Sequence, residues 1–370
     1  MMQEIKIPLD WPNISELERD YILKALASGY VSSAGPLVRE FEQRFAAYLG
    51  ISHAVAVVNG TAGLHLALKL LGIGPGDEVI VPALTFIATV NPVVYVGARP
   101  VAVDVDPRTW NIDPAAIEKA ITKHTRAIIP VHLYGNPADM DAILGLAREY
   151  GLYVIEDATE ALGSTYKGKK TGTFGHIGVF SFNGNKIITT GGGGMLVTED
   201  PELARRARIL VNQGREPGET EYEHKEIGFN YRLTNLQAAL GLAQLERLPE
   251  FLAAKRRNAA IYRRELQGIP GVDWQQELPG TESNWWLFSI LIIAEKYGES
   301  REALMARLSG RGIQFRPLFK PIPLQPCYSH YSFPPCPVAV NLYAEGINLP
   351  SASFLEKDDI MAVCANLFPR

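Results

Sequence analysis

Residues 179–195 read VFSFNGNKIITTGGGGM, and the rest of the chain is interpreted outward from this stretch. Its apolar and aromatic start is typical of a short buried strand. The strand breaks at an Asn-Gly-Asn turn, which is followed by Lys186 and then by four consecutive glycines. A buried ammonium group is costly unless it is paired or neutral, and a desolvated neutral amine can form a Schiff base with an aldehyde cofactor. The alternative is a surface lysine in a hairpin, so the remaining sequence has to distinguish the two.

Length and composition indicate an ordered enzyme-sized protein. A chain of 370 residues is too long for one compact core and fits a large and a small domain. The content of 47% hydrophobic and 21% charged residues shows no bias toward disorder. The net charge of -4, with both signs interspersed, argues against nucleic acid as a main partner.

The cysteines and the chain start bear on metals and on location. Cys327, Cys336 and Cys364 lack the spacing of a metal site, and an odd count does not suggest a disulfide framework, so no metal is expected. The first residues do not read as a signal peptide, and no apolar run reaches membrane-spanning length. We therefore expect a cytoplasmic protein without a membrane partner.

From His53 onward, short apolar runs alternate with helical patterns, which is typical of an α/β fold. Strands are predicted over 54–58, 78–82, 100–106, 127–131 and 153–157, and helices over 15–28, 64–71, 138–150 and 202–211. A helical pattern from 234 to 266 bridges into a second domain with a strand over 285–293, helices over 301–310 and 356–367, and an irregular segment over 317–338. We divide the chain into a large domain, 1–245, and a small C-terminal domain, 246–370.

The turn Asn59–Gly63 follows the first of these strands and precedes a helix. Free N–H groups at a helix N-terminus point outward and attract anions, and the Thr61 hydroxyl adds a donor. Many strand-to-helix turns share this pattern without binding anything, so the turn alone is a weak signal.

Two further positions lie just beyond strand ends. Phe86 follows the strand 78–82 and suits either the core or an aromatic face over a flat ring. Asp157 ends the strand 153–157, where sites in open α/β sheets form. A buried aspartate needs a cationic partner, and a protonated pyridine nitrogen would serve. The alternative is that Asp157 is a helix N-cap, for which Asp is a preferred residue, and by itself this residue favours neither interpretation. Glu160 is expected on a short helix that starts here.

Pyridoxal phosphate requires all four features together. Its phosphate needs a helix N-terminus, its ring a stacking face, its pyridine nitrogen a carboxylate, and its aldehyde a lysine. The turn 59–63, Phe86, Asp157 and Lys186 match these needs in turn. Four independent alternatives would have to coincide to produce the same set, so the combination predicts a site for this cofactor.

At this point the chain resembles the DegT/DnrJ/StrS family of nucleotide-sugar aminotransferases, and the resemblance covers essentially its whole length. The matching stretches are GYVSSAGP at 29–36, NGTA at 59–62, PALTFIAT at 82–89, EDATEA at 156–161, 181–195, and GFNYR at 228–232. The resemblance implies the fold type I architecture of pyridoxal-phosphate enzymes. In that architecture a large domain with a mostly parallel mixed sheet flanked by helices carries a smaller C-terminal α+β domain.

The same resemblance implies roles for individual residues. Lys186 joins the cofactor, Asp157 holds its pyridinium, Phe86 stacks on the ring, and Glu160 acts in catalysis. The phosphate is bound by Gly60, Thr61, Ala62 and Ser181 and by Asn230 of a neighbouring subunit, so a homodimer with shared sites is implied. The substrate contacts are Ser32, Ser33, Glu160, Arg232 and Arg316.

The substrate is less defined than the cofactor. Many relatives have Gln at the position of Glu160, and Glu occurs in enzymes that aminate C4 of 4-keto-6-deoxy sugars with L-glutamate as donor. The run 181–195 most resembles enzymes of the bacillosamine and legionaminic acid type, which act on UDP-linked 4-keto-6-deoxy-N-acetylhexosamine. The rival is a GDP-4-keto-6-deoxymannose 4-aminotransferase of the perosamine synthase type.

Two other classes stay open. A dehydratase of the same fold would usually carry His in place of Lys186, and a regulator without turnover would be expected to lose Lys186 or Asp157.

Overall fold

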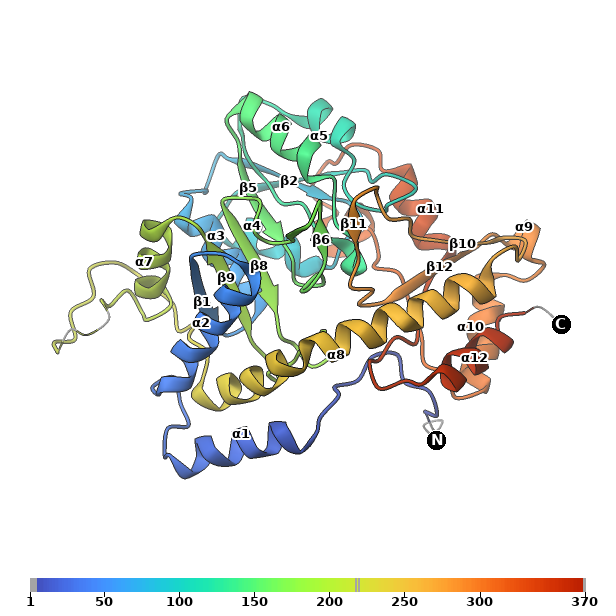
Figure 1. The fold of residues 1–370 in the computed structure, drawn as a ribbon. Coiled ribbons are helices and arrows are strands. Elements are labelled where there is room, and N and C mark those ends of the chain that lie inside the picture. Colours follow the sequence, from blue (N-terminus) through green and yellow to red (C-terminus); the bar gives the residue numbers. More distant parts are fainter. Residues whose placement is uncertain (1–4, 217, 219, 369–370) are drawn as a thin grey trace.

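The computed structural model describes residues 5–216, 218 and 220–368 (Figure 1). Its centre is a seven-stranded sheet with the order β1-β9-β8-β5-β4-β2-β3. The strands are β1 (His53–Val57), β2 (Glu78–Pro82), β3 (Arg99–Val103), β4 (Thr125–Ile128), β5 (Tyr153–Asp157), β8 (Ile177–Ser181) and β9 (Gly194–Thr198). All pairings are parallel except those of β9, which runs antiparallel to both β1 and β8. The predicted mixed, mostly parallel sheet is confirmed.

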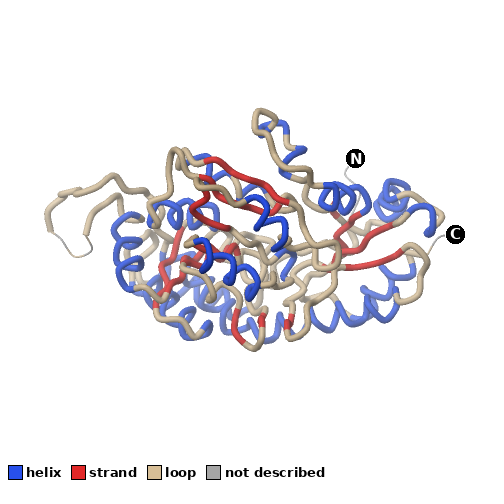
Figure 2. The backbone as a smooth tube through the Cα atoms, turned by 90° about the horizontal axis from the view of Figure 1, so that it is seen from above, coloured by secondary structure: helices blue, strands red, loops and turns tan. Residues whose placement is uncertain are grey.

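Both faces of the sheet are buried, which explains why most residues of its strands are apolar. Successive residues of β2 enter different cores: Val79 and Val81 pack on one face and Ile80 on the other. The helices of this part are α2 (Pro36–Leu49), α3 (Gly60–Leu70), α4 (Asn91–Tyr95), α5 (Pro114–Ala120), α6 (Met140–Tyr150) and α7 (Pro201–Leu210). Seen from above, the strands lie between layers of helix (Figure 2).

A second, smaller core forms around an antiparallel sheet with the order β10-β12-β14-β13. Its strands are β10 (Val272–Trp274), β12 (Phe288–Ile292), β13 (Arg316–Pro317) and β14 (Gly346–Leu349), and its helices include α9 (Ala294–Tyr297), α10 (Arg301–Gly310) and α12 (Lys357–Ala365). The helix α11 (Pro337–Glu345) buries Ala339 and Leu342 in the larger core instead. A three-stranded sheet of β6 (Thr165–Tyr166), β7 (Lys169–Lys170) and β11 (Thr281–Glu282) joins chain segments from both parts.

The helix α8 (Asn235–Leu266) runs from one part to the other (Figure 1). It begins at a capping box of Thr234 and Gln237 and continues without a break past Pro249. It packs against α1 (Glu16–Ala27) and α2 at one end and α12 at the other. The predicted domain boundary between 245 and 246 falls inside this helix and stays a prediction.

Several predicted elements differ from the structure. Residues 158–163 form consecutive turns, with Ala161 N–H donating to Ala158 O, so the short helix expected at Glu160 is wrong. The helix expected from 64 begins at Gly60. The strand expected from 285 begins at Phe288, because Trp285 has a left-handed φ of 52° that no strand accommodates. In the described part of the chain, no helix is long and apolar enough to cross a membrane.

One buried ion pair ties the two parts together. Lys255 of α8 donates from Nζ to Asp10 Oδ1 at 3.0 Å and to the carbonyl oxygens of Trp286 at 3.0 Å and Ser351 at 2.9 Å. Burial raises the pKa of Asp10 to about 6, and the charge of Lys255 limits that rise. A single ammonium group therefore donates hydrogen bonds to the N-terminal segment, at Asp10, and to two later loops, at Trp286 and Ser351.

We expect Lys255→Met to lower the free energy of unfolding by about 3–5 kcal/mol, because it leaves the Asp10 carboxylate buried without its partner. Urea unfolding followed by circular dichroism measures the change. Arg264→Met is the matched control on the same helix, since the Arg264–Glu265 pair is exposed and contributes roughly 0–1 kcal/mol. Equal effects of the two substitutions would contradict this account.

Candidate functional site

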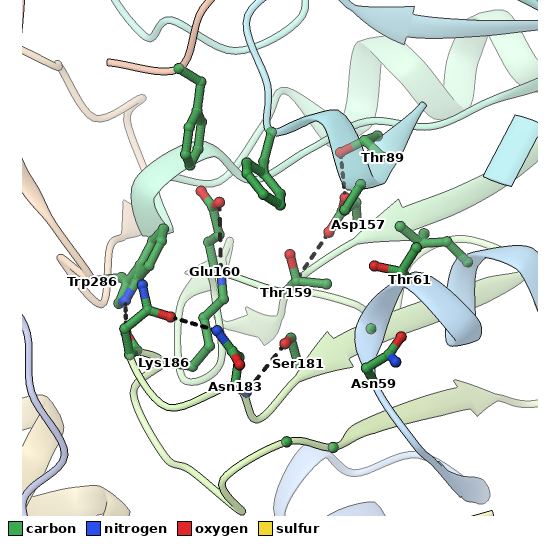
Figure 3. Close-up of a pocket in the computed structure, with 18 residues that line it drawn as sticks. Asn59, Thr61, Thr89, Asp157, Thr159, Glu160, Ser181, Asn183, Lys186 and Trp286 are labelled. Atoms are coloured by element: carbon green, nitrogen blue, oxygen red, sulfur yellow. Dashed lines mark hydrogen bonds and ion pairs between the residues drawn. The ribbon is translucent and has the colours of Figure 1, made fainter. Parts of the chain in front are cut away.

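The carboxyl ends of the parallel strands meet at one edge of the central sheet, and a cavity of about 280 Å³ lies there (Figure 3). The strand β9 runs the other way, so its beginning reaches the same edge and brings Gly192 and Gly193 to the cavity wall. Seven of the predicted residues line this cavity: Gly60, Thr61, Phe86, Asp157, Glu160, Ser181 and Lys186.

The N-terminus of α3 forms one end of the cavity. Asn59 is its N-cap, and its side-chain oxygen accepts a hydrogen bond from Ala62 N–H at 2.8 Å. The Ala62 N–H group is therefore already occupied, and Ala62 does not line the cavity, contrary to its predicted contact with a phosphate. A Cβ atom at Gly60 would lie 3.0 Å from the Thr159 methyl group and 3.1 Å from Ser181 Cβ, so a side chain would fill this end of the cavity.

Asp157 lies at the end of β5 and is buried. Its Oδ2 accepts from the Thr89 hydroxyl at 2.7 Å, and Thr89 is joined in turn to Thr85 at 2.8 Å. Its Oδ1 accepts from Thr159 N–H at 3.2 Å, which is the local turn contact that the N-cap alternative anticipated. Two neutral donors orient the carboxylate toward the cavity without neutralising its charge (Figure 3).

Lys186 enters the cavity from the turn after β8, with its side chain 13% exposed. Its Nζ lies 3.7 Å from Glu160 Oε1 and 3.8 Å from the centroid of the Trp286 ring. Burial lowers the pKa of Lys186, while the carboxylates of Glu160, Asp157 and Asp10 act in the opposite direction. The amine is thus more nucleophilic than an exposed lysine and still has partners for its charged form.

Glu160 faces Lys186 across the cavity, and its other carboxylate oxygen accepts from the backbone N–H of Tyr134 at 2.7 Å. Burial raises the pKa of Glu160 to about 7, opposed by Lys186 and the Tyr134 N–H group and assisted by the negative charge of Asp157. A carboxyl group with such a pKa exchanges its proton near neutral pH.

Five of the predicted residues lie elsewhere. Ser33 and Arg232 line a separate cavity with Arg39, Arg208 and Arg215. Ser32 and Asn230 are exposed, and Asn230 pairs with Asn212 outside the first cavity. Arg316 is exposed on β13 in the small core, away from Lys186. Within one chain, the structure therefore does not bring these five residues to the cofactor cavity.

Sequence reasoning missed several residues of the cavity wall. Thr89 lies three positions after Phe86, and a polar residue in that otherwise apolar run was an available signal. Trp286 and Phe319 come from the C-terminal part of the chain, where Trp286 is buried in the larger core and Phe319 packs against it, and the centroid of the Phe319 ring lies 5.4 Å from that of Phe86. Their sequence neighbourhoods carry no mark of a site.

The residues present fit pyridoxal phosphate. The glycine-bordered helix N-terminus with Thr61 and Ser181 suits a phosphate, and Phe86 lines the cavity. Asp157 lies at one end of the cavity and the Lys186 side chain at the other (Figure 3). The chemistry of this donor set matches the groups of the cofactor one by one.

The family model for the DegT/DnrJ/EryC1/StrS aminotransferase family matches residues 12–368. A GDP-perosamine synthase from Caulobacter vibrioides is 46% identical over 363 residues, which cover 98% of this chain and 97% of that protein. A GDP-perosamine synthase from Escherichia coli O157:H7 is 44% identical over 361 residues, covering 98% and 97%.

Solved structures of other proteins superimpose on nearly the whole of this chain. The aminotransferase TlmJ from Streptoalloteichus hindustanus superimposes with a TM-score of 0.92 at 34% identity, over 98% of this chain and 97% of that one. The aminotransferase from Psychrobacter cryohalolentis gives a TM-score of 0.92 at 32% identity, over 96% and 97%. A mutant of the GDP-4-keto-6-deoxymannose-3-dehydratase ColD with bound GDP-perosamine gives 0.92 at 28% identity, over 98% and 100%.

The raised pKa of Glu160 predicts a pH-dependent stability. The folded protein holds the Glu160 proton up to about pH 7, whereas the unfolded chain releases it near pH 4.5. The contribution of Glu160 to stability is therefore complete below pH 4.5 and is lost as the pH rises to about 7. Between about pH 5 and about pH 8, we expect the cofactor-free protein to lose on the order of 1–3 kcal/mol relative to Glu160→Gln.

Urea unfolding of the cofactor-free protein and of Glu160→Gln across this pH range measures the difference. Parallel pH profiles of the two proteins would show that Glu160 is ionised throughout and would contradict the prediction.

Proposed function

We propose a function from the premise that this chain belongs to the DegT/DnrJ/EryC1/StrS aminotransferase family. It is a pyridoxal-phosphate-dependent sugar aminotransferase of fold type I. The proposal concerns the finer points: the nucleotide sugar, the amino donor and the oligomeric state.

The proposed reaction transfers an amino group from L-glutamate to C4 of GDP-4-keto-6-deoxymannose. The observation that carries it is the full-length similarity to GDP-perosamine synthases, at 46% and 44% identity. Both of these relatives are named for a GDP-linked sugar. They favour the perosamine synthase alternative over the UDP-linked N-acetylated sugar that the run 181–195 resembles.

The dehydratase and the regulator without turnover have less support. Lys186, which a dehydratase would replace, is present and lines the cavity, and Asp157 is also present there. The ColD dehydratase shares the fold at 28% identity, which is lower than the identity to either perosamine synthase.

The residues that line the cavity have different roles in the proposed reaction. When bound, the cofactor supplies an electron sink for the charge that develops at the carbon losing a proton. Asp157 holds the ring nitrogen in its protonated form, and the Thr89 hydroxyl and Thr159 N–H keep the carboxylate in place. Lys186 Nζ, once displaced by the donor amine, accepts the proton from the donor Cα and later returns a proton to the sugar carbon. Glu160 donates a hydrogen bond to the sugar or to the cofactor oxygen beside it.

A second copy of the chain is proposed to complete the site. The described residues 220–229, which follow α7, project from the body of the protein in both views and include exposed apolar residues, with Tyr222 84% and Ile227 91% exposed (Figures 1 and 2). Asn230 follows this segment and is exposed. Arg232, two residues further along the chain, lines the arginine-rich cavity together with Ser33. Guanidinium groups suit the diphosphate of a nucleotide sugar, so we assign these residues to the neighbouring subunit's substrate.

The nucleotide is tested by assaying the purified enzyme with L-glutamate and GDP- or UDP-linked 4-keto-6-deoxy sugars. We expect kcat/KM for the GDP-linked sugar to be higher by at least about 100-fold, because a site that hydrogen-bonds one base leaves buried groups unpaired with the other. Release of 2-oxoglutarate and mass spectrometry of the product measure it. A preference for the UDP-linked N-acetylated sugar would overturn the proposed substrate while leaving the aminotransferase assignment intact.

Shared sites are tested by mixing two inactive proteins. Lys186→Ala removes the amine of one site, and Asn230→Ala removes the contact proposed to reach the other. After subunit exchange, we expect activity to reappear at up to about a quarter of the wild-type level, since one site in each heterodimer has only intact residues. Sedimentation verifies the exchange, and Lys186→Ala mixed with itself is the control. Exchange without recovery would place Asn230 in the site of its own chain.

A further inference from the structure

The surroundings of the Lys186 amine contain one group that the reaction described above does not use. The Trp286 ring lies with its centroid 3.8 Å from Lys186 Nζ, well inside the range of a cation–π interaction. The Glu160 carboxylate lies on another side of the amine, 3.7 Å from Nζ. Figure 3 shows both groups beside the lysine side chain. An ammonium at this position thus has a carboxylate and an electron-rich ring as partners.

The Trp286 ring is held in this position by two hydrogen bonds. Its indole Nε1–H donates to the carbonyl oxygen of Asn185 at 2.6 Å, so the ring is tied to the residue that precedes the lysine. Its backbone N–H donates to Asn284 Oδ1 at 2.8 Å. Trp286 itself is buried, with 2% exposure. The position of the ring beside Lys186 is therefore fixed by the Asn185 carbonyl, and the backbone of Trp286 by the Asn284 side chain.

The Glu160 carboxylate is held by independent contacts. Tyr134 N–H donates to Oε2 at 2.7 Å, which leaves Oε1 for Lys186. Tyr134 has a left-handed φ of 55°, a conformation that bulky residues rarely adopt without a reason. The fully buried Asn284 donates from Nδ2 to the Glu160 carbonyl at 3.0 Å while it accepts from Trp286 N–H, so one side chain links the two groups.

We propose that Trp286 is a positioning residue that, together with Glu160, holds the ε-ammonium group of Lys186 whenever the lysine is not joined to the cofactor. The proposal rests on the proposed role of Lys186 and extends it. In the reaction, the displaced neutral amine gains one proton from the donor Cα and becomes an ammonium. That ammonium stays within the cavity between Glu160 Oε1 and the ring, close to where its proton is next needed.

The alternative for a displaced lysine is unfavourable on physical grounds. Burial disfavours the charged amine and lowers its pKa. The charged groups that face it are Glu160 and Asp157 around β5 and Asp10 of the N-terminal segment, and each favours the ammonium. Asp157 is engaged by Thr89 and the ring nitrogen of the cofactor, and Asp10 by Lys255. In its ionised form, Glu160 therefore remains with the Trp286 ring as a partner of the ammonium.

The test uses the full-length protein without cofactor, so that it reads the amine directly. Competitive acetylation with acetic anhydride at a series of pH values, followed by mass spectrometry of the Lys186 peptide, measures the pKa of the amine. The variants are Trp286→Phe and Trp286→Leu. The matched controls are Trp285→Phe and Trp285→Leu, because Trp285 is the adjacent buried tryptophan but packs on Phe288 of the small core.

We expect Trp286→Leu to lower the pKa of Lys186 by roughly 0.5–1.5 units and Trp286→Phe by a smaller amount, because a phenyl ring binds cations less well than indole. The Trp285 variants should leave this pKa unchanged. In the cofactor-loaded enzyme, Trp286→Leu should lower kcat several-fold more than it raises KM for the sugar, and should shift the pH profile of kcat. Thermal unfolding of all four variants checks that each is folded.

Equal pKa values of Lys186 in the wild type and both folded Trp286 variants would overturn the proposal, as would equal shifts in the Trp285 and Trp286 series. If Trp286→Leu fails to fold, Trp286→Phe alone decides between these outcomes. Failure of the underlying function would look different. In that case borohydride reduction of the holoenzyme would label a residue other than Lys186, whatever the pKa values of the variants.

Discussion

The burial of the Lys186 amine beside the Glu160 carboxylate is the constraint on which the rest of the site depends. A lysine in water is protonated and unreactive, and a lysine buried among apolar groups alone would be costly to keep there. Here burial lowers the pKa of the amine while Glu160 and Trp286 still stabilise its charged form. The pKa of Glu160 is raised to about 7 in the same environment. The pKa of the amine and the pKa of the carboxyl group are therefore both shifted toward neutral pH.

The antiparallel strand β9 makes this arrangement possible in the chain's own topology. In a purely parallel sheet, the segment after β8 would have to leave the edge by a long crossover. Instead it turns within the stretch 182–193 and enters β9 from the same edge, so Lys186 and the glycines stay beside the strand ends. The site therefore receives a lysine and a close-packed glycine wall from one short connection.

The C-terminal part of the chain belongs to the site as well. It contributes Trp286 and Phe319 to the cavity wall, and the carbonyl oxygens of Trp286 and Ser351 share the Lys255 ammonium with Asp10. The Tyr134 side chain adds a further link, because its hydroxyl accepts from Phe319 N–H at 2.9 Å while its backbone N–H donates to Glu160. Since these contacts converge, a shift of the C-terminal segments against the central sheet would also move the groups around Lys186.

Local sequence patterns were sufficient for the α/β fold and for the groups that lie at strand ends. Asp157, Lys186, Phe86 and the turn at Gly60 could be predicted because the carboxyl ends of parallel strands share one edge, so position along the chain translates directly into position in space. The same reasoning was wrong for the short helix at Glu160, and the phosphate contact of Ala62, which the resemblance implied, stays a prediction. There, the outcome depends on which donor a particular side chain captures, and Asn59 captures the Ala62 N–H.

The sequence by itself therefore determined the fold class and predicted the groups that line the cavity, since each of them lies on or next to a regular element with a readable period. Only the tertiary structure decided what surrounds the lysine. Trp286 reaches Asn185 across 101 residues of chain, and Tyr134 reaches Glu160 through a left-handed backbone. Contacts of that kind join segments that lie far apart in the sequence, and neither hydrophobic period nor residue type at the separate positions specifies them.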